Sequence, residues 1–436
     1  GYTCSDLFEH EILLNAAKQA LFEIAEETKE IDALVFVGAP LAVDGKLYNV
    51  ATAMNQGKSL GLTSKTFLPN YGEFYEMRQF TPGPKTDREI LVNGEKIPFG
   101  PNLLFQAKEM EELVVSAEIC EDVWSPIPPS IQAAMEGATV IVNCSASDET
   151  IGKGRYRREL IQGQSARLIA GYIYANAGEG ESTTDLVFGG HNIIAENGSI
   201  LAESKRFENG IICTELDLHR LISERRRNTT FQLAEERILP RISFSIKKEE
   251  TGLTRTFPSR PFVPSSETER AYRCEEILTI QAMGLKKRLA HTHAGCAVVG
   301  ISGHGGMVIG TGDMSELALG WATYNGDHMS MYGVNASVPK TLVRHLVKYA
   351  ADVAEDKELS EVLYDVLDTP VSPELLPPKD GEIAQKTEDL VGPYELHDFY
   401  LYYMLRFGYG PEKIYRLALQ TFDGEYDAAT IKKWLQ

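Results

Sequence analysis

One of the six cysteines occupies a position from which it could act as a nucleophile. Residues 114–119 are a short run typical of a buried strand, and Cys120 follows at the point where the run ends. α/β enzymes often present nucleophiles at such strand ends, because the scaffold is rigid and the side chain points out of the sheet. A cysteine can equally be a small apolar core residue, so its neighbours must decide between the two interpretations.

A second segment supplies a cation and a carboxylate. Residues 64–74 contain Lys65, a Leu-Pro pair and Glu73, which follows the lysine by eight positions. Alone, this segment could be a solvated loop. Taken with the Ile-Cys-Glu-Asp run at 119–122, its K-x-x-L-P-x-x-G-E pattern resembles the nitrilase, or carbon–nitrogen hydrolase, superfamily.

The resemblance implies a Glu-Lys-Cys triad on an α-β-β-α sandwich. In that chemistry a carboxylate takes the thiol proton, the thiolate attacks an amide carbonyl, and the ammonium stabilises the oxyanion. An acyl-enzyme and free ammonia result. By resemblance Cys120 is the nucleophile, Lys65 the triad lysine and Glu73 a supporting carboxylate near both. The triad glutamate itself is expected before Gly1.

Three further segments make the resemblance more specific. Residues 1–8, 71–76 and 178–185 are similar to the glutaminase domain of glutamine-dependent NAD+ synthetases. This likeness runs through essentially the whole first domain. In that family glutamine is held by residues that map to Tyr71, Ser147 and Lys153, whose ring, hydroxyl and cation could fix an amino-acid zwitterion.

A second group of motifs lies near the middle of the chain. Residues 298–303 predict a buried strand that ends in the turn Ser302-Gly303, where backbone N–H groups could approach a phosphate. Residues 309–321 resemble the G-T-G-D-x-S-E-x-x-L-G-W segment of NAD+ synthetases, as do residues 335–342. The resemblance implies a Rossmann-like, adenine-nucleotide-binding domain that adenylylates deamido-NAD+ with ATP, after which ammonia displaces AMP.

The same resemblance assigns residues to the two substrates of this second domain. ATP is expected at Ser302, Gly303 and Thr311, with Mg2+ neutralising its phosphates. Glu316 is a candidate magnesium ligand, although a helix-surface glutamate is the alternative. Deamido-NAD+ is expected along a set of residues that follow the G-T-G-D motif: Glu316, Trp321, Ala322, Thr323 and Tyr324.

The phosphate loop departs from the family pattern. The family reads S-G-G-x-D-S where this chain has Ser-Gly-His-Gly-Gly at 302–306. The sequence then passes almost at once to the next motif, so a segment is expected to be missing near 303–307. A doubly wound sheet that loses a strand and its partner helix exposes its core. The second domain is therefore expected to be incomplete.

The elements that would position these residues alternate along the chain. Strands are predicted at 33–37, 48–54, 113–119, 139–142 and 172–175, with helices at 127–137 and 155–170. Such alternation indicates a layered α/β fold. Residues 228–269 are rich in proline and polar residues and predict a linker. It would join a first domain at 1–227 to a second at 270–436.

Composition excludes several classes of protein. The chain of 436 residues has 43 Lys and Arg against 62 Asp and Glu, a net charge of −19, which disfavours nucleic acid and anionic membranes as partners. No apolar run has the length of a membrane span, and the first thirty residues do not resemble a signal peptide. A cytoplasmic protein is expected. The cysteine spacing indicates neither disulfides nor zinc.

The motifs together predict a glutamine-dependent NAD+ synthetase that takes glutamine, ATP and deamido-NAD+. By resemblance it is expected to form a homo-oligomer. Two alternatives stay open. The chain could be a stand-alone amidase of the nitrilase superfamily, indifferent to ATP and deamido-NAD+. It could also be a catalytically inactive fragment that acts only in assembly.

Overall fold

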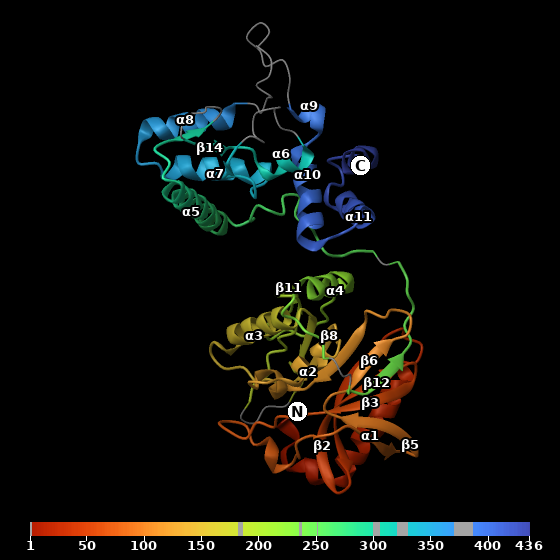
Figure 1. Cartoon of the computed structure of the whole chain (residues 1–436). Coiled ribbons are helices and arrows are strands. Elements are labelled where there is room, and N and C mark those ends of the chain that lie inside the picture. Colours follow the sequence, from red (N-terminus) through yellow and green to blue (C-terminus); the bar gives the residue numbers. More distant parts are fainter. Residues whose placement is uncertain are drawn as a thin grey trace. The chain divides into compact units, whose positions relative to one another are not determined.

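The computed structural model describes residues 2–181, 186–234, 238–250, 252–299, 306–320, 330–369 and 387–436. The chain divides into two compact units, Gly1–Arg255 and Thr256–Gln436 (Figure 1). Each unit has its own sheet structure and its own clusters of buried apolar side chains. No helix of the described residues is both long enough and apolar enough to cross a membrane.

The first unit contains two mixed sheets. The five-stranded sheet has the order β1 (Val35–Val43), β2 (Lys46–Asn55), β3 (Lys58–Ser64), β5 (Glu95–Gly100) and β4 (Arg88–Val92). The seven-stranded sheet has the order β11 (Ser199–Glu203), β10 (Ile193–Glu196), β9 (Gly171–Asn176), β8 (Val140–Ser145), β7 (Val114–Glu118), β6 (Leu104–Ala107) and β12 (Arg241–Phe244). Its central strands β7, β8 and β9 run parallel.

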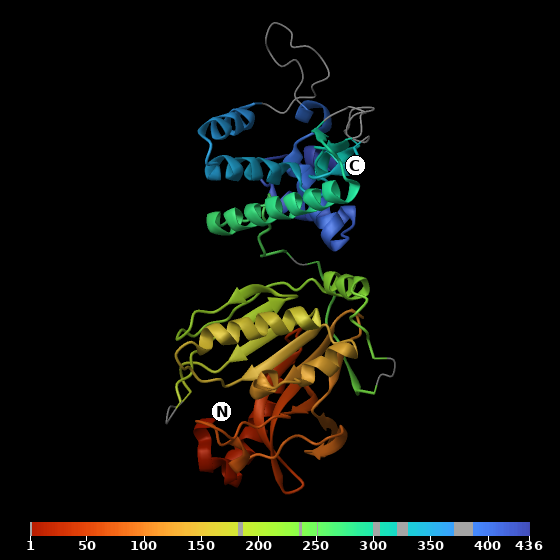
Figure 2. The same ribbon diagram turned by 60° about the vertical axis from the view of Figure 1, so that its left-hand side comes forward.

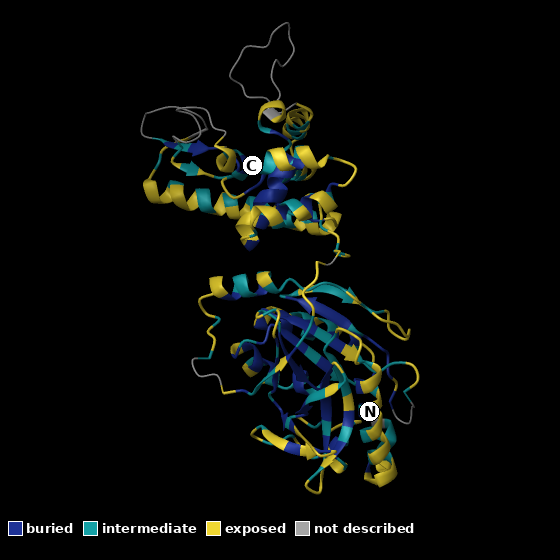
Figure 3. Ribbon diagram, turned by 90° about the vertical axis from the view of Figure 1, so that its right-hand side faces the viewer, coloured by how far each residue is buried: buried dark blue, intermediate teal, exposed yellow. Residues whose placement is uncertain are grey.

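Helices cover the outer face of each sheet. The helix α1 (Glu11–Glu27) buries Leu21 and Ala25 against the five-stranded sheet. On the seven-stranded sheet, α2 (Pro129–Met135) and α3 (Lys153–Leu168) pack over a separate cluster (Figure 2). A third cluster joins the inner faces of the two sheets, with Ala53 on one side and Val115 on the other. Many residues of these two sheets are coloured as buried in Figure 3. The layers therefore follow the predicted α-β-β-α order.

Short 3-10 helices and one further α-helix complete the first unit. They are η1 (Tyr2–Glu9), η2 (Glu76–Arg78), η3 (Cys120–Trp124) and α4 (Leu218–Arg227). The predicted linker 228–269 would leave the first unit directly after α4. The structure differs, because the first unit extends to Arg255. After α4 the chain first forms β12, which pairs in parallel with β6 and is the last strand of the sheet.

The second unit has a smaller sheet and is rich in helices. Its described sheet is parallel and consists of β13 (Ala297–Val299), β14 (Met307–Gly310) and β15 (Tyr332–Gly333). The helix α5 (Glu267–Thr292) precedes β13, and α6 (Met314–Leu319) follows β14. The chain continues through α7 (Lys340–Val353), α8 (Lys357–Asp368), α9 (Thr387–Val391), α10 (Tyr394–Leu401), a π-helical turn (Tyr402–Arg406), α11 (Pro411–Thr421) and α12 (Ala428–Leu435). A parallel sheet with helices agrees with the predicted α/β class.

Candidate active site

Cys120 lies where the chain leaves the central sheet of the first unit. It follows β7 and is the first residue of η3. Its side chain is largely buried, at 8% exposure, and its φ of 45° is in the left-handed region, which costs a residue with a side chain about 1 kcal/mol or more. The backbone N–H donates to Asn143 Oδ1 at 2.9 Å. A strained turn thus presents the thiol at the carboxyl end of a central strand.

Lys65 directly follows β3 and is held in a buried ion pair. Its ammonium contacts Glu76, and both side chains are almost fully enclosed. Asn49 on β2 donates a second hydrogen bond to Glu76 Oε1 at 2.8 Å. Burial opposes the charge on Lys65, but the neighbouring Cys120 and Glu76 outweigh it and raise the lysine pKa. Lys65 is therefore a fixed ammonium beside the thiol.

The carboxylate beside Lys65 is not the one that the sequence pattern selects. Glu73, expected near both Lys65 and Cys120, is exposed and lines a cavity with Cys120, whereas Glu76 makes the ion pair. The reason is a turn in which Phe74 N–H donates to the carbonyl of Tyr71 at 2.9 Å, after which η2 begins at Glu76. The turn leaves Glu73 outside and directs Glu76 inward.

Two cavities share Cys120 in their linings. The first has a volume of about 330 Å³ and is also lined by Lys65, Glu76 and Cys144. The second has a volume of about 380 Å³, and its lining contains every residue expected to bind glutamine together with aromatic and acidic side chains: Tyr71, Glu73, Phe74, Trp124, Ser147, Lys153 and Tyr156. The structure therefore brings the expected glutamine-binding residues together around the thiol.

The expected glutamine-binding residues are themselves held by hydrogen bonds and ion pairs. Lys153 contacts Asp148, and its ammonium lies 5.2 Å from the ring centroid of Phe74. Ser147 Oγ accepts from a buried arginine, Arg157, at 3.2 Å. The hydroxyl of Tyr71 donates to a carboxylate in the turn after Cys120. A cation and two hydroxyls thus face one cavity in fixed positions.

Asp122 joins the lysine segment to the cysteine turn, a role that sequence reasoning missed. Its Oδ1 accepts from the backbone N–H groups of Thr66 at 3.0 Å and Phe67 at 2.8 Å, and its Oδ2 accepts from Ile119 at 2.9 Å. Burial raises the pKa of Asp122 to about 7, while these hydrogen bonds act in the opposite direction. In the sequence, only its position two residues after Cys120 could have indicated this role.

The candidate residues of the second unit are only partly described. Thr311 directly follows β14 and is exposed. Glu316 closes a capping box on α6, accepting from the N–H of Asp313 at 3.1 Å, and also contacts Lys340. Lys340 pairs with Asp313 at 2.7 Å as well. The remaining candidates lie outside the described residues: Ser302, Gly303, Trp321, Ala322, Thr323 and Tyr324.

The contacts of Glu316 do not fit a magnesium ligand. Its two oxygens are engaged by the Asp313 N–H and by the Lys340 ammonium. Within the described parts of the chain, no group of three or more His, Cys, Asp or Glu side chains could hold a metal ion. The helix-surface alternative for Glu316 therefore agrees with the observed contacts, and no chemical step at Glu316 is assigned to a metal.

Comparison with known proteins gives the family. Residues 5–226 match the carbon–nitrogen hydrolase family model. The chain is 34% identical to the glutamine-dependent NAD(+) synthetase of Mycobacterium tuberculosis strain H37Rv, covering 100% of this chain and 83% of that protein. The chain belongs to the glutamine-dependent NAD+ synthetase family. The corresponding Mycobacterium leprae protein is also 34% identical, covering 95% of this chain and 78% of its own length.

The family match extends over both units but also shows a difference in length. The alignment with the M. tuberculosis synthetase runs over 569 positions, whereas this chain has 436 residues, so that relative contains residues without a counterpart here. The expected gap near 303–307 lies mostly outside the described residues and stays a prediction. Among solved structures, the glutamine-dependent NAD(+) synthetase from Cytophaga hutchinsonii is 18% identical in sequence to this chain. The match covers 100% of this chain and 83% of the Cytophaga chain, with a TM-score of 0.44.

Proposed function

We propose that the first unit of this synthetase hydrolyses glutamine at Cys120 and that the second unit uses the ammonia to amidate deamido-NAD+ with ATP. The observation that supports this most strongly is the position of Cys120. One cavity beside the thiol contains the buried Lys65–Glu76 pair, and the other contains the expected glutamine-binding side chains. A nucleophile, an oxyanion stabiliser and a zwitterion site thus share one centre.

The proposed hydrolysis begins when the Cys120 thiolate attacks the side-chain amide carbon of glutamine. Before the attack, the thiol gives its proton to the triad glutamate that the family resemblance implies. Lys65 then stabilises the oxyanion of the tetrahedral intermediate, and its enclosed position makes this interaction stronger than it would be in water. As the C–N bond breaks, the departing nitrogen takes the proton back from the triad glutamate and leaves as ammonia, and water then hydrolyses the thioester to glutamate and the free thiol.

Substrate selection is assigned to the second cavity. We infer that Lys153 pairs with the α-carboxylate of glutamine, while Tyr71 and Ser147 supply hydroxyls to its polar groups. Phe74 and Trp124 lie beside the ammonium, with ring centroids 5.2 and 5.8 Å from Lys153 Nζ. These rings exclude water from one side of the cation, which strengthens its attraction to a carboxylate.

The amidation is assigned to the second unit. ATP would transfer AMP to the nicotinate carboxylate of deamido-NAD+ with release of pyrophosphate, and ammonia would then displace AMP to form the amide. Thr311 supports an ATP site here, because it follows β14 at the carboxyl end of a parallel sheet, where nucleotides commonly bind in α/β folds. Glu316 and residues 321–324 are assigned to deamido-NAD+. ATP would bring Mg2+ on its phosphates.

The wider cellular setting is also part of the proposal. The family resemblance supports a homo-oligomer, and the net charge of −19 argues against nucleic acid and anionic membranes as partners. We expect a cytoplasmic enzyme, where glutamine and ATP are both available. Sedimentation analysis of the purified protein tests the oligomer directly, and a monomer at micromolar concentration would contradict it.

The separation of the two activities is tested with Cys120→Ala. NAD+ formation is measured with deamido-NAD+, ATP and either glutamine or an ammonium salt. The variant should lose glutamine-supported synthesis and keep ammonia-supported synthesis, because only the first unit uses the thiol. Loss of both activities would argue against separate sites. Glutamine hydrolysis by the unaltered protein without any NAD+ formation would favour the stand-alone amidase.

A further inference from the structure

The backbone of Cys120 is held on both sides by one buried side chain. Asn143 Oδ1 accepts from the Cys120 N–H at 2.9 Å, and Asn143 Nδ2 lies 3.5 Å from the Cys120 carbonyl oxygen. Asn143 belongs to β8, where it pairs in register with Glu118 of β7, just before the cysteine. The residue with the strained φ of 45° therefore has its peptide groups fixed from the neighbouring strand.

Two further buried residues determine which way the Asn143 amide points. Asn143 Nδ2 donates to the hydroxyl oxygen of Tyr172 at 3.2 Å, and the Tyr172 hydroxyl donates in turn to Glu118 Oε1. Glu118 Oε2 accepts from the N–H of Ser130 in α2 at 3.0 Å. Asn143, Tyr172 and Glu118 are each exposed by 1% or less, so water cannot replace these partners.

The polarity of this chain of hydrogen bonds has one consistent direction. The Cys120 N–H can only donate, so Asn143 turns its carbonyl oxygen toward it. The NH2 group of Asn143 then faces Tyr172, whose oxygen accepts and whose own proton points toward Glu118. In the opposite amide orientation, the NH2 group would face the Cys120 N–H, donor against donor, and the carbonyl oxygen would face the accepting oxygen of Tyr172.

We propose that Asn143 is a positioning residue for the nucleophile, and that Tyr172 and Glu118 fix the orientation of its side-chain amide. This inference rests on the proposed role of Cys120. With Asn143 held, the turn keeps its left-handed conformation and the thiol stays beside Lys65. Without that hold, the backbone at Cys120 relaxes toward ordinary φ values and the sulfur moves. Displacement of a reacting atom by about 1 Å can reduce a rate 10²-fold.

The proposal predicts an effect on turnover and not on substrate affinity. In the described part of the chain, the linings of the two cavities that share Cys120 do not include Asn143, Tyr172 or Glu118. Removing any of them takes no contact from a bound glutamine. The value of kcat should therefore fall while KM stays nearly constant.

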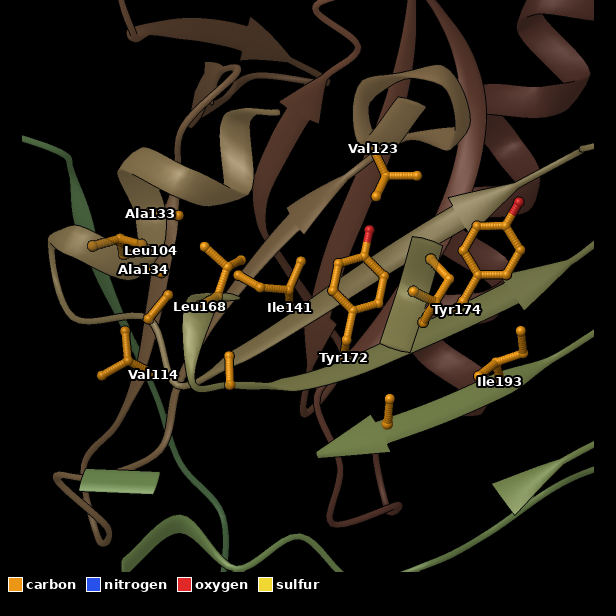
Figure 4. Close-up of a cluster of buried hydrophobic side chains, with 14 of the residues drawn as sticks. Leu104, Val114, Val123, Ala133, Ala134, Ile141, Leu168, Tyr172, Tyr174 and Ile193 are labelled. Carbon is orange, nitrogen blue, oxygen red and sulfur yellow. The ribbon is translucent and has the colours of Figure 1, made fainter. Parts of the chain in front are cut away.

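The strand β9 offers a closely matched control. Tyr174 lies two residues beyond Tyr172 on the same face, and both rings are buried in one cluster (Figure 4). The hydroxyl of Tyr174 is 2.6 Å from Ser145 Oγ and is not part of the Asn143 hydrogen bonds. Tyr172→Phe and Tyr174→Phe both remove a buried hydroxyl from the same strand. Only the first releases Asn143, whereas the second takes a partner from Ser145 and from Ser147 of the expected glutamine site.

The experiment measures three quantities for both variants: kcat and KM for ammonia release from glutamine, the Tm, and the pH profile of Cys120 alkylation by iodoacetamide. Tyr172→Phe should lower kcat about 10-fold, leave KM within about twofold and change the alkylation profile. Tyr174→Phe should leave kcat within about twofold, and any kinetic change should be in KM, because its hydroxyl contacts Ser147. Similar decreases in Tm for the two variants would show that stability alone does not explain the difference.

Two outcomes overturn the proposal. An unchanged kcat in Tyr172→Phe would do so, as would equal losses in the two tyrosine variants. Should Tyr172→Phe fail to fold, Glu118→Gln replaces it. A glutamine has one oxygen and one NH2 group, so its NH2 would face a donor at either Tyr172 or Ser130. The kcat of this variant should also fall with KM unchanged. If the unaltered protein releases no ammonia from glutamine, the proposed function fails instead, which separates the two claims.

Discussion

Lys65 and Glu76 form an ion pair in which the lysine is 2% exposed and the glutamate 4%. The two residues are eleven positions apart, and the turn at 71–74 brings them together. Removing one partner of a buried pair leaves an uncompensated charge and costs about 3–5 kcal/mol of stability. Replacing both partners with neutral groups of similar size is often neutral. This asymmetry allows the catalytic and structural roles of Lys65 to be separated.

We predict that Lys65→Met lowers both stability and the rate of glutamine hydrolysis, the rate by about 10²-fold or more because the oxyanion loses its cation. The double variant Lys65→Met/Glu76→Gln should regain most of the stability, since no charge is left buried without a partner. Its rate of hydrolysis should stay low. Urea denaturation and a steady-state ammonia assay measure the two effects on the same samples.

The control for this pair is an exposed ion pair on the surface of α3. Arg155 and Glu159 are 86% and 55% exposed, so Arg155→Ala should change stability by less than about 0.5 kcal/mol and leave the rate unaltered. Recovery of activity in the double variant would mean that Lys65 acts only through the fold. That result would exclude it as the oxyanion stabiliser.

We predict that the stability of the protein depends on pH through the buried carboxyl of Asp122. Because burial raises its pKa to about 7 in the folded state, from an ordinary value near 4, the folded protein binds an extra proton between about pH 4 and pH 7. The free energy of unfolding contributed by Asp122 is therefore fully present below pH 4 and is lost as the pH rises through about 7. The slope of this loss has a limit of about 1.4 kcal/mol per pH unit.

Asp122→Asn isolates this contribution. Asparagine can still accept from Thr66 and Phe67 but turns its donor toward Ile119, so the variant should be less stable than the unaltered protein at pH 5. The difference should decrease as the pH approaches 8, because only the unaltered protein loses stability over this range. Denaturant unfolding at four pH values measures it. A difference that grows with pH would show that Asp122 is ionised throughout.

Lys153 is predicted to act on glutamine binding. Lys153→Met should raise KM for glutamine by about 10-fold, equivalent to about 1.4 kcal/mol, while kcat changes little, because a charge that holds the α-carboxylate acts equally before and during the reaction. Arg155→Ala, two residues further on the same helix, is again the matched control. A fall in kcat at constant KM would instead assign Lys153 to the chemical step.

The place of Cys120 could be predicted from sequence because the information is local. An apolar run of strand length ends directly before the cysteine, and the structure has β7 end at Glu118. The choice between Glu73 and Glu76 could not be predicted in this way. Both glutamates belong to one short segment, and the backbone turn from Tyr71 to Phe74 decides which carboxylate faces inward. The number of residues that separate each glutamate from Lys65 does not reveal this turn.

Contacts between distant strands were also beyond the sequence. Asn143 follows the predicted strand at 139–142 and carries no motif of its own, and its contact with Cys120 depends on the register between β7 and β8. The strand β12 is four residues long within a polar segment, and it pairs with β6, which precedes it by more than a hundred residues. Such pairings are set by tertiary packing, which periodicity alone does not report.

The central claim is that Cys120 is the nucleophile for glutamine, and the most direct test is covalent labelling. The probe is a glutamine analogue with a diazoketone in place of its side-chain amide, and peptide mass mapping locates the adduct. The chain has six free cysteines, and Cys144 lines the first cavity with Cys120. The account predicts that the label is found on Cys120 and that glutamine protects it. A label on Cys144, or glutamine turnover without any adduct on Cys120, would contradict it.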